Sequence, residues 1–164
     1  MFPPEMDRLL TLAEIAVAMA GFSAIVVLFR RRTSGTWLAA DADRFNGMIV
    51  HSVSATALCL VPAIIGVFTT DPAQVWRIAS SVLGLQVLLH AGIVVFYLAS
   101  TGLAGSILVA TGGSTVVALQ VLNVTGIGFS AEPGPYLLGV CWHLIQAGGL
   151  FTRLVWVGEA SIER

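Results

Sequence analysis

Four ionisable side chains lie inside long apolar stretches of the sequence: Glu14, His51, His90 and His143. All three histidines of the chain are among them. Ionisable groups are costly inside a bilayer, so they mark candidate functional positions in a membrane protein. Glutamate and histidine side chains both accept and release protons. These four residues are therefore candidate functional positions, and the hypotheses below divide them between an ion or proton path and a haem site.

Five apolar stretches hold these residues, and each is long enough to cross a bilayer, which takes about 20 helical residues. Their apolar runs are continuous rather than alternating, which favours helices over membrane strands. We therefore expect an all-α integral membrane protein in which residues 1–164 form a single transmembrane domain, a bundle of five transmembrane helices. The predicted spans cover residues 9–29, 45–68, 75–98, 107–127 and 136–157.

The composition supports a membrane protein and excludes several classes of function. Hydrophobic residues make up 57% of the chain and charged residues 10%, with a mean hydropathy of +0.91, whereas soluble domains carry about 25% charged residues. The net charge of −1 provides no positive field for nucleic acid. The chain has no lysine, which excludes a phosphate-binding P-loop and Schiff-base chemistry. No nucleophile, base and orienting group occur as a set, so we do not expect an enzyme.

The arginines predict the orientation of the bundle, because positive residues are enriched on the cytoplasmic side of membrane proteins. With five spans, Arg8 and Arg77 fall on one side and the other six of the eight arginines fall on the opposite side. We therefore expect a multi-pass protein of a bacterial inner membrane, with the N-terminus outside and the C-terminus cytoplasmic. The six arginines expected inside are Arg30, Arg31, Arg32, Arg44, Arg153 and Arg164.

The helical rise predicts a polar layer near the outer face. Glu14 lies about 8 Å and His143 about 10 Å below the outer ends of their spans. Gln120 and Asn123 of the fourth span reach similar depths, and Gln146 lies one turn beyond His143. We expect Glu14 to pair with His143 in this layer. The first hypothesis is an ion or proton channel or transport protein that needs no metal and no cofactor.

Small residues on the first span predict contact between copies of the chain. Glu14 shares one helical face with Ala18 and Gly21, and a second face carries alanines at positions 16, 20 and 24. Small residues allow membrane helices to approach closely. A chain of 164 residues rarely encloses a pore alone. We therefore expect a homo-oligomer, with the lipid bilayer and other copies as its partners and no nucleic acid.

Two alternatives use the polar residues differently. His51 and His90 lie at similar predicted depths from the inner face, about 9 and 12 Å. Two histidines can ligate one b-type haem, which predicts a membrane anchor or electron-carrier subunit. The third hypothesis is an accessory subunit of a larger membrane complex. Each polar residue also has a structural interpretation, as a hydrogen-bonding group between helices.

Three local signals predict helix ends and helix contacts. Asp71-Pro72 is typical of a helix start, because aspartate caps free backbone N–H groups and proline suits the first turn. The glycines of residues 125–129 indicate a helix exit. Gly112-Gly113 in the fourth span favours a close approach between helices.

Overall fold

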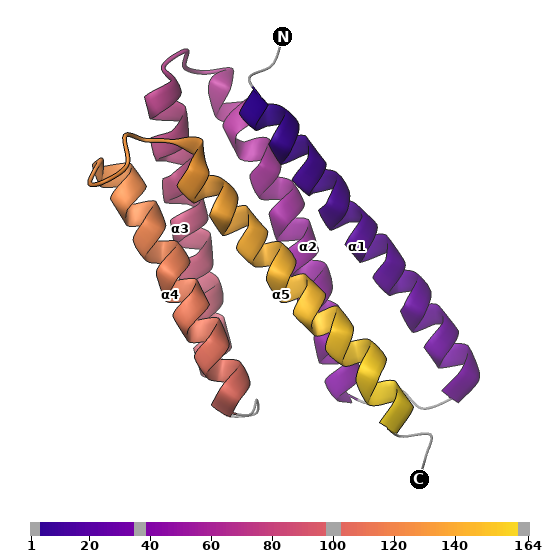
Figure 1. The fold of residues 1–164 in the computed structure, drawn as a ribbon. Coiled ribbons are helices and arrows are strands. Elements are labelled where there is room, and N and C mark those ends of the chain that lie inside the picture. Colours follow the sequence, from indigo (N-terminus) through magenta and orange to yellow (C-terminus); the bar gives the residue numbers. More distant parts are fainter. Residues whose placement is uncertain (1–3, 35–38, 98–102, 161–164) are drawn as a thin grey trace. The chain divides into compact units, whose positions relative to one another are not determined.

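The computed structural model describes residues 4–34, 39–97 and 103–160, and over these residues the fold is all-helical, with no strand. This confirms the predicted all-α class. The described helices are α1 (Pro4–Ser34), α2 (Ala39–Gly66), α3 (Pro72–Tyr97), α4 (Leu103–Thr125) and α5 (Pro133–Ala160) (Figure 1).

Two stretches of the described residues are long and apolar enough to cross a membrane: Pro4–Phe29 within α1 and Asp41–Gly66 within α2. Val109–Thr125 of α4 is a shorter apolar helix. The chain therefore carries two candidate membrane spans by length and composition. Within these spans, 17% of the first and 33% of the second is buried inside the chain. Most residues of the first stretch are thus not buried against the described residues of the chain.

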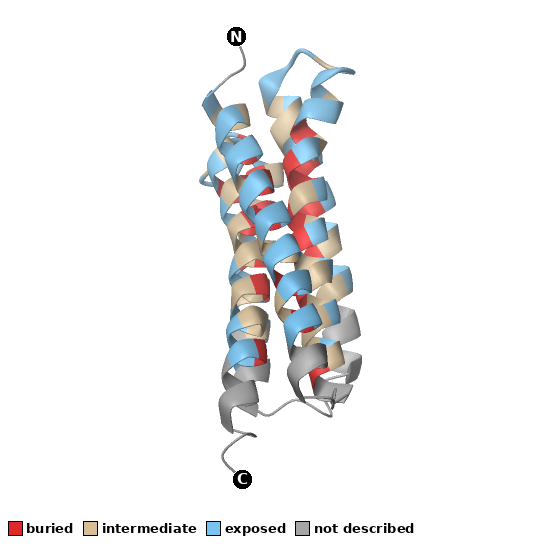
Figure 2. Cartoon of the chain, turned by 90° about the vertical axis from the view of Figure 1, so that its right-hand side faces the viewer, coloured by how far each residue is buried: buried red, intermediate tan, exposed pale blue. Residues whose placement is uncertain are grey.

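The chain divides into two compact units. Unit 1 consists of Met1–Cys59 and His143–Arg164, and unit 2 consists of Leu60–Trp142. Helices α2 and α5 continue from one unit into the other. Along the described helices, buried and exposed residues fall on separate faces (Figure 2). In α1 the buried face carries Leu9, Ala13, Ala16, Ser23 and Val27, the three-to-four-residue spacing of a helix with one packed side.

In unit 1, α1 contacts both α2 and α5. Ser23 of α1 is fully buried and donates a hydrogen bond to Met48 Sδ of α2 at 2.8 Å. A Cβ added at Gly148 of α5 would lie 3.6 Å from Met19 Cε of α1. Figure 1 shows α1 and α5 running in the same direction and α2 in the opposite one. A hydrophobic core joins the three helices, formed by Val27, Met48, Ala147 and Leu154 with Met19, Phe45, Leu150 and Phe151 packed against it.

In unit 2, α3 packs along α4, and the first turns of α5 contact both helices. Glycines let the helices approach. A Cβ at Gly84 of α3 would lie 3.3 Å from Gln120 Cβ, and one at Gly112 of α4 would overlap the ring of Trp142. The close approach predicted for the glycines of the fourth span therefore occurs at Gly112.

Both predicted helix ends lie where the sequence places them. Asp71 Oδ1 accepts a hydrogen bond from Ala73 N at 3.0 Å, and Pro72 begins α3. At the end of α4, Gly126 has a φ of 78°, and Ile127 N donates to Leu122 O at 3.1 Å. This six-to-one bond with a left-handed glycine is the Schellman motif that ends many helices.

Candidate functional site

Two of the four candidate ionisable residues meet inside unit 1. His51 of α2 and His143 of α5 approach each other with their Nδ1 atoms 3.2 Å apart. Their ring centroids are 5.5 Å apart, and the ring planes are inclined by 42°. The His143 side chain is 1% exposed and His51 is half-buried. The pair thus forms a partly buried contact between two helices.

The distance between the two Nδ1 atoms restricts the protonation of the pair. A hydrogen bond needs one nitrogen that carries a proton and one with a free lone pair. One ring must therefore be protonated at Nδ1 while the other presents an unprotonated Nδ1. Two neutral imidazoles meet this condition when they adopt opposite tautomers.

Small residues and one hydroxyl surround this pair along its own helices. Ala55 lies four residues after His51, and Ala147 four residues after His143, both fully buried. Ser52 follows His51 directly and is also fully buried. Among the described residues, its Oγ atom has no hydrogen-bond partner. One turn after each histidine, its own helix thus carries a small, buried alanine.

Glu14 lies at about the predicted depth but on the opposite face of α1. The Met19–Gly148 contact aligns α1 with α5, which run in the same direction, and Glu14 and His143 each lie five residues before that contact. Ala13 and Ala16, however, occupy the buried face, whereas Glu14 is exposed. Within the described residues, Glu14 makes no hydrogen bond or ion pair, so the expected Glu14–His143 pair does not form inside the chain.

The two amides of α4 hold the connection between α4 and α5. Gln120 Nε2 donates to Pro135 O at 2.8 Å. Asn123 Nδ2 donates to Ser80 Oγ and to Glu132 O, and its Oδ1 accepts from Glu132 N, each at 2.9 Å. Both amides are essentially fully buried. These contacts favour the structural interpretation of Gln120 and Asn123 over a path, while Gln146 lies half-buried one turn beyond His143.

His90 lies in unit 2 and bonds within its own helix. Its Nδ1 lies 2.8 Å from Gln86 Nε2, one turn earlier on α3. This is the shared face that the four-residue spacing predicts. His51 belongs to unit 1 and contacts His143 instead. The haem hypothesis, in which His51 and His90 ligate one group, stays a prediction.

Unlike Glu14, the hydroxyl groups on the exposed faces of the helices form hydrogen bonds within their own helices. Each of six exposed serines and threonines donates to the carbonyl oxygen four residues earlier in its own helix. Such bonds satisfy a hydroxyl without a partner helix. A carboxyl group has no equivalent intrahelical arrangement here. The six residues are Thr11, Ser81, Thr111, Thr115, Thr125 and Thr152.

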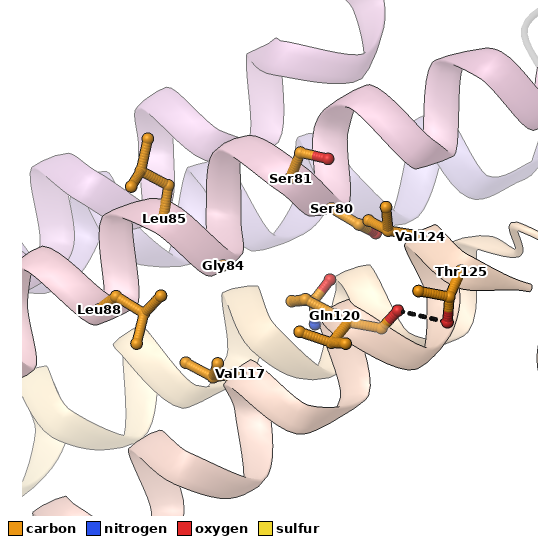
Figure 3. Close-up of a pocket in the computed structure, with 10 residues that line it drawn as sticks. Ser80, Ser81, Gly84, Leu85, Leu88, Val117, Gln120, Val124 and Thr125 are labelled. Carbon is orange, nitrogen blue, oxygen red and sulfur yellow. Dashed lines mark hydrogen bonds between the residues drawn. The ribbon is translucent and has the colours of Figure 1, made fainter. Parts of the chain in front are cut away.

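A groove of about 280 Å³ lies between α3 and α4 (Figure 3). Leu85, Leu88 and Val117 lie toward one end, and Ser80 and Thr125 toward the other. Gln120 lines the groove but donates its amide to the Pro135 carbonyl. Within the described part of the chain, no three or more His, Cys, Asp or Glu side chains are grouped to hold a metal ion.

The pairing of His51 with His143 was not predicted, because the spans were estimated too short. Starting the second span at residue 45 places His51 about 9 Å from its inner end. In the structure α2 begins at Ala39, six residues earlier, which moves His51 about 9 Å further along the helix. The aspartates and the arginine before Phe45 are charged, so the predicted span began after them. Asp41 and Arg44 pair with each other at 3.0 Å within the first turns of α2.

Comparison of the chain with models of protein families, with curated proteins and with solved structures found no match.

Proposed function

We propose that this chain is a homo-oligomeric, multi-pass protein of a bacterial inner membrane that conducts ions or protons through polar groups around Glu14 and His143. In this proposal all five helices cross the membrane, the N-terminus is outside and the C-terminus is cytoplasmic. The mean hydropathy and the two candidate spans support a membrane location.

The observation that carries the proposal is the exposed carboxyl group of Glu14 on a helix that is otherwise suited to lipid. Its neighbours on the exposed surface include Leu10, Val17 and Leu28. An acidic side chain facing hydrocarbon is costly, so such residues normally face protein or a water-filled cavity. Within the described chain, no residue bonds to Glu14. A second polypeptide or a pore is therefore expected at this face.

A second copy of the chain fits this face. Ala18 and Gly21 lie on the same side of α1 as Glu14 and are exposed. A Cβ added at Gly21 would have no atom within 4 Å, so the surface of α1 at this glycine, two turns after Glu14, is open. Small residues at this spacing let two membrane helices approach closely. Symmetric contact between copies would bring two Glu14 carboxyl groups together at one depth.

The histidine pair lies at the same level as Glu14 but on the side of α1 that faces the rest of unit 1. Titratable groups therefore occupy two positions at one depth in unit 1. Glu14 lies on the exposed face of α1, and His51 and His143 lie between α2 and α5. Groups of this kind are typical of intramembrane ion and proton routes.

Flux and cross-linking measurements on purified protein in liposomes test the proposal. Glu14→Gln should lower ion or proton flux while the protein still folds. Asp7→Asn is the matched control, because Asp7 is an exposed acid on the same face two turns earlier; its flux should stay within twofold of wild type. Equal flux in Glu14→Gln and wild type from about pH 5 to pH 8 would contradict a role for Glu14 in the path.

Disulfide cross-linking tests the contact between copies. In a background without Cys59 and Cys141, Ala18→Cys should form a disulfide-linked dimer, because Ala18 is exposed beside Glu14. Ala16→Cys should form no disulfide-linked dimer under the same oxidation, because residue 16 is fully buried in its own chain. Protein that stays monomeric in several mild detergents would refute the homo-oligomer. A different chain that co-purifies would favour the accessory-subunit alternative, and a haem absorption band would favour the haem alternative.

A further inference from the structure

We infer that the conducted species is the proton, and that the His51–His143 pair passes it between α2 and α5; this inference rests on the transport function proposed above. The pair combines two observations: an Nδ1–Nδ1 distance of 3.2 Å between side chains of two helices, and the burial of one of them, His143. Neither observation was used to assign Glu14 its role.

The geometry of the contact defines a balanced sequence of proton transfers. In the neutral pair, the donor ring carries its proton at Nδ1 and has a lone pair at Nε2, whereas the acceptor ring carries its proton at Nε2. A proton that binds the donor ring at Nε2 makes that ring an imidazolium. Its Nδ1 proton then crosses the 3.2 Å contact to Nδ1 of the acceptor ring. The acceptor ring releases its original proton from Nε2. Because Nε2 of His143 is buried, a water molecule must reach this atom to deliver or accept the proton.

One proton enters and one leaves in this sequence, and no bond other than N–H bonds changes. The hydrogen bond between the rings has reversed its direction at the end. Both rings must exchange tautomers before the next transfer in the same direction. The pair therefore carries one proton per cycle and has a reset step.

The contact also limits the pair to one added proton. With both rings charged, each Nδ1 would carry a proton and the two N–H groups would point at each other across 3.2 Å. Two positive charges with ring centroids 5.5 Å apart repel strongly in an apolar interior. We therefore expect the two histidines to titrate as one coupled site rather than as two independent ones.

The surroundings of the pair fit a proton better than a metal cation. Sodium, potassium and magnesium ions prefer oxygen ligands, whereas this contact presents imidazole nitrogens. Along α2 and α5, Ala55 and Ala147 on the next turn are apolar, and Ser52 supplies one hydroxyl. Within the described residues, no third His, Cys, Asp or Glu completes a metal site.

In the described part of unit 1, the following charged residues lie on another helix face or several turns from the pair. On α1, Glu14 is at the same level but on the exposed face. On α2, Asp41 and Arg44 pair with each other at least seven residues before His51. On α5, Arg153 is exposed ten residues after His143. The pH dependence of proton flux should therefore reflect the histidine pair.

Flux through liposomes tests the inference with a pH-sensitive dye inside the vesicles for protons, and with separate potassium and sodium gradients. We expect proton flux without potassium or sodium flux in wild type. His51→Gln and His143→Gln should each lower proton flux at least tenfold, and His90→Gln should stay within twofold. Because buried His143→Gln risks misfolding, half-buried His51→Gln is the primary variant, with its fold checked by circular dichroism.

Nitrogen NMR of histidine-labelled wild-type protein in lipid nanodiscs provides a second measurement. A scalar coupling between the two Nδ1 atoms, lost in His51→Gln and kept in His90→Gln, would support the shared proton. Two independent one-proton titrations of His51 and His143 would overturn the inference. Potassium or sodium flux that His51→Gln leaves unchanged would overturn it while leaving the transport proposal intact. No flux of any ion from oligomeric wild-type protein would overturn both.

Discussion

Asn123→Ala should destabilise the protein without acting on a transport path. Asn123 was predicted as a path residue, but the structure surrounds it with three hydrogen bonds of 2.9 Å. Two of them join Glu132 in the segment that connects α4 to α5, and the third joins Ser80 of α3. The side chain is 0% exposed. Alanine removes all three bonds and introduces no new group.

The expected cost follows from the number of bonds. A net contribution of about 1 kcal/mol per hydrogen bond gives about 3 kcal/mol for three bonds. The average measured between membrane helices, about 0.6 kcal/mol per bond, gives about 2 kcal/mol. The buried Ser80 hydroxyl loses its donor, which places the cost toward the upper value. We expect Asn123→Ala to lower the free energy of unfolding by about 2–3 kcal/mol.

Reversible unfolding in mixed micelles, followed by circular dichroism as the fraction of denaturing detergent rises, measures this free energy. Asn46→Ala is the control, because Asn46 is an exposed asparagine of α2, and its unfolding free energy should stay within about 0.5 kcal/mol of wild type. Asn123→Asp keeps an acceptor for Glu132 N but loses both donors. It should therefore lower the free energy of unfolding by at least the contribution of one hydrogen bond.

Two results would refute this reasoning. If Asn123→Ala is as stable as Asn46→Ala, the three bonds do not hold the α4–α5 connection. If Asn123→Ala retains wild-type stability but changes flux in liposomes, the residue belongs to a path, as the sequence alone predicted.

Two further predictions concern helix contacts and helix ends. Gly112→Ala should lower the free energy of unfolding by about 1–3 kcal/mol because its Cβ would overlap the Trp142 ring, whereas Gly113→Ala, with Val87 Cγ1 at 3.9 Å, should be neutral or stabilising in the same micelle titration. Equal changes in the free energy of unfolding at the two glycines would show that helix propensity, rather than packing, determines the effect of the added methyl group. Asp71→Ala should cost about 1 kcal/mol because it removes the bond from Ala73 N that caps α3; Asp71→Ser, which keeps a capping oxygen, should recover most of that loss.

The sequence predicted the helices, the start of α3 and the end of α4 because these depend on local chemistry. Continuous apolar runs require the backbone to satisfy its own hydrogen bonds, and helices do so within one segment. Asp71 caps α3, and Gly126 adopts the left-handed conformation that ends α4. Both effects act within a few residues. Neither needs information about neighbouring helices.

The faces of the helices were harder to predict than their depths. Glu14 and His143 lie at the same level, as the rise per residue predicted, but α1 turns its alanines rather than Glu14 toward the rest of unit 1. Rotation about the helix axis depends on the packing of Ala13, Ala16 and Ser23 against other helices. The sequence of α1 places small residues on both faces, so it does not distinguish the inner face from the outer one.

Whether a polar residue has a hydrogen-bond partner within the described chain explains which polar residues are candidates for function. Gln120 and Asn123 are buried with partners inside the chain, so their hydrogen bonds account for their presence. The exposed hydroxyls bond to their own helices. Glu14 has neither kind of partner among the described residues, and the free energy of placing its carboxyl group in a membrane must be offset from outside the chain. Glu14, exposed on an apolar helix, is therefore the residue that best supports the proposed contact with another copy or with an ion.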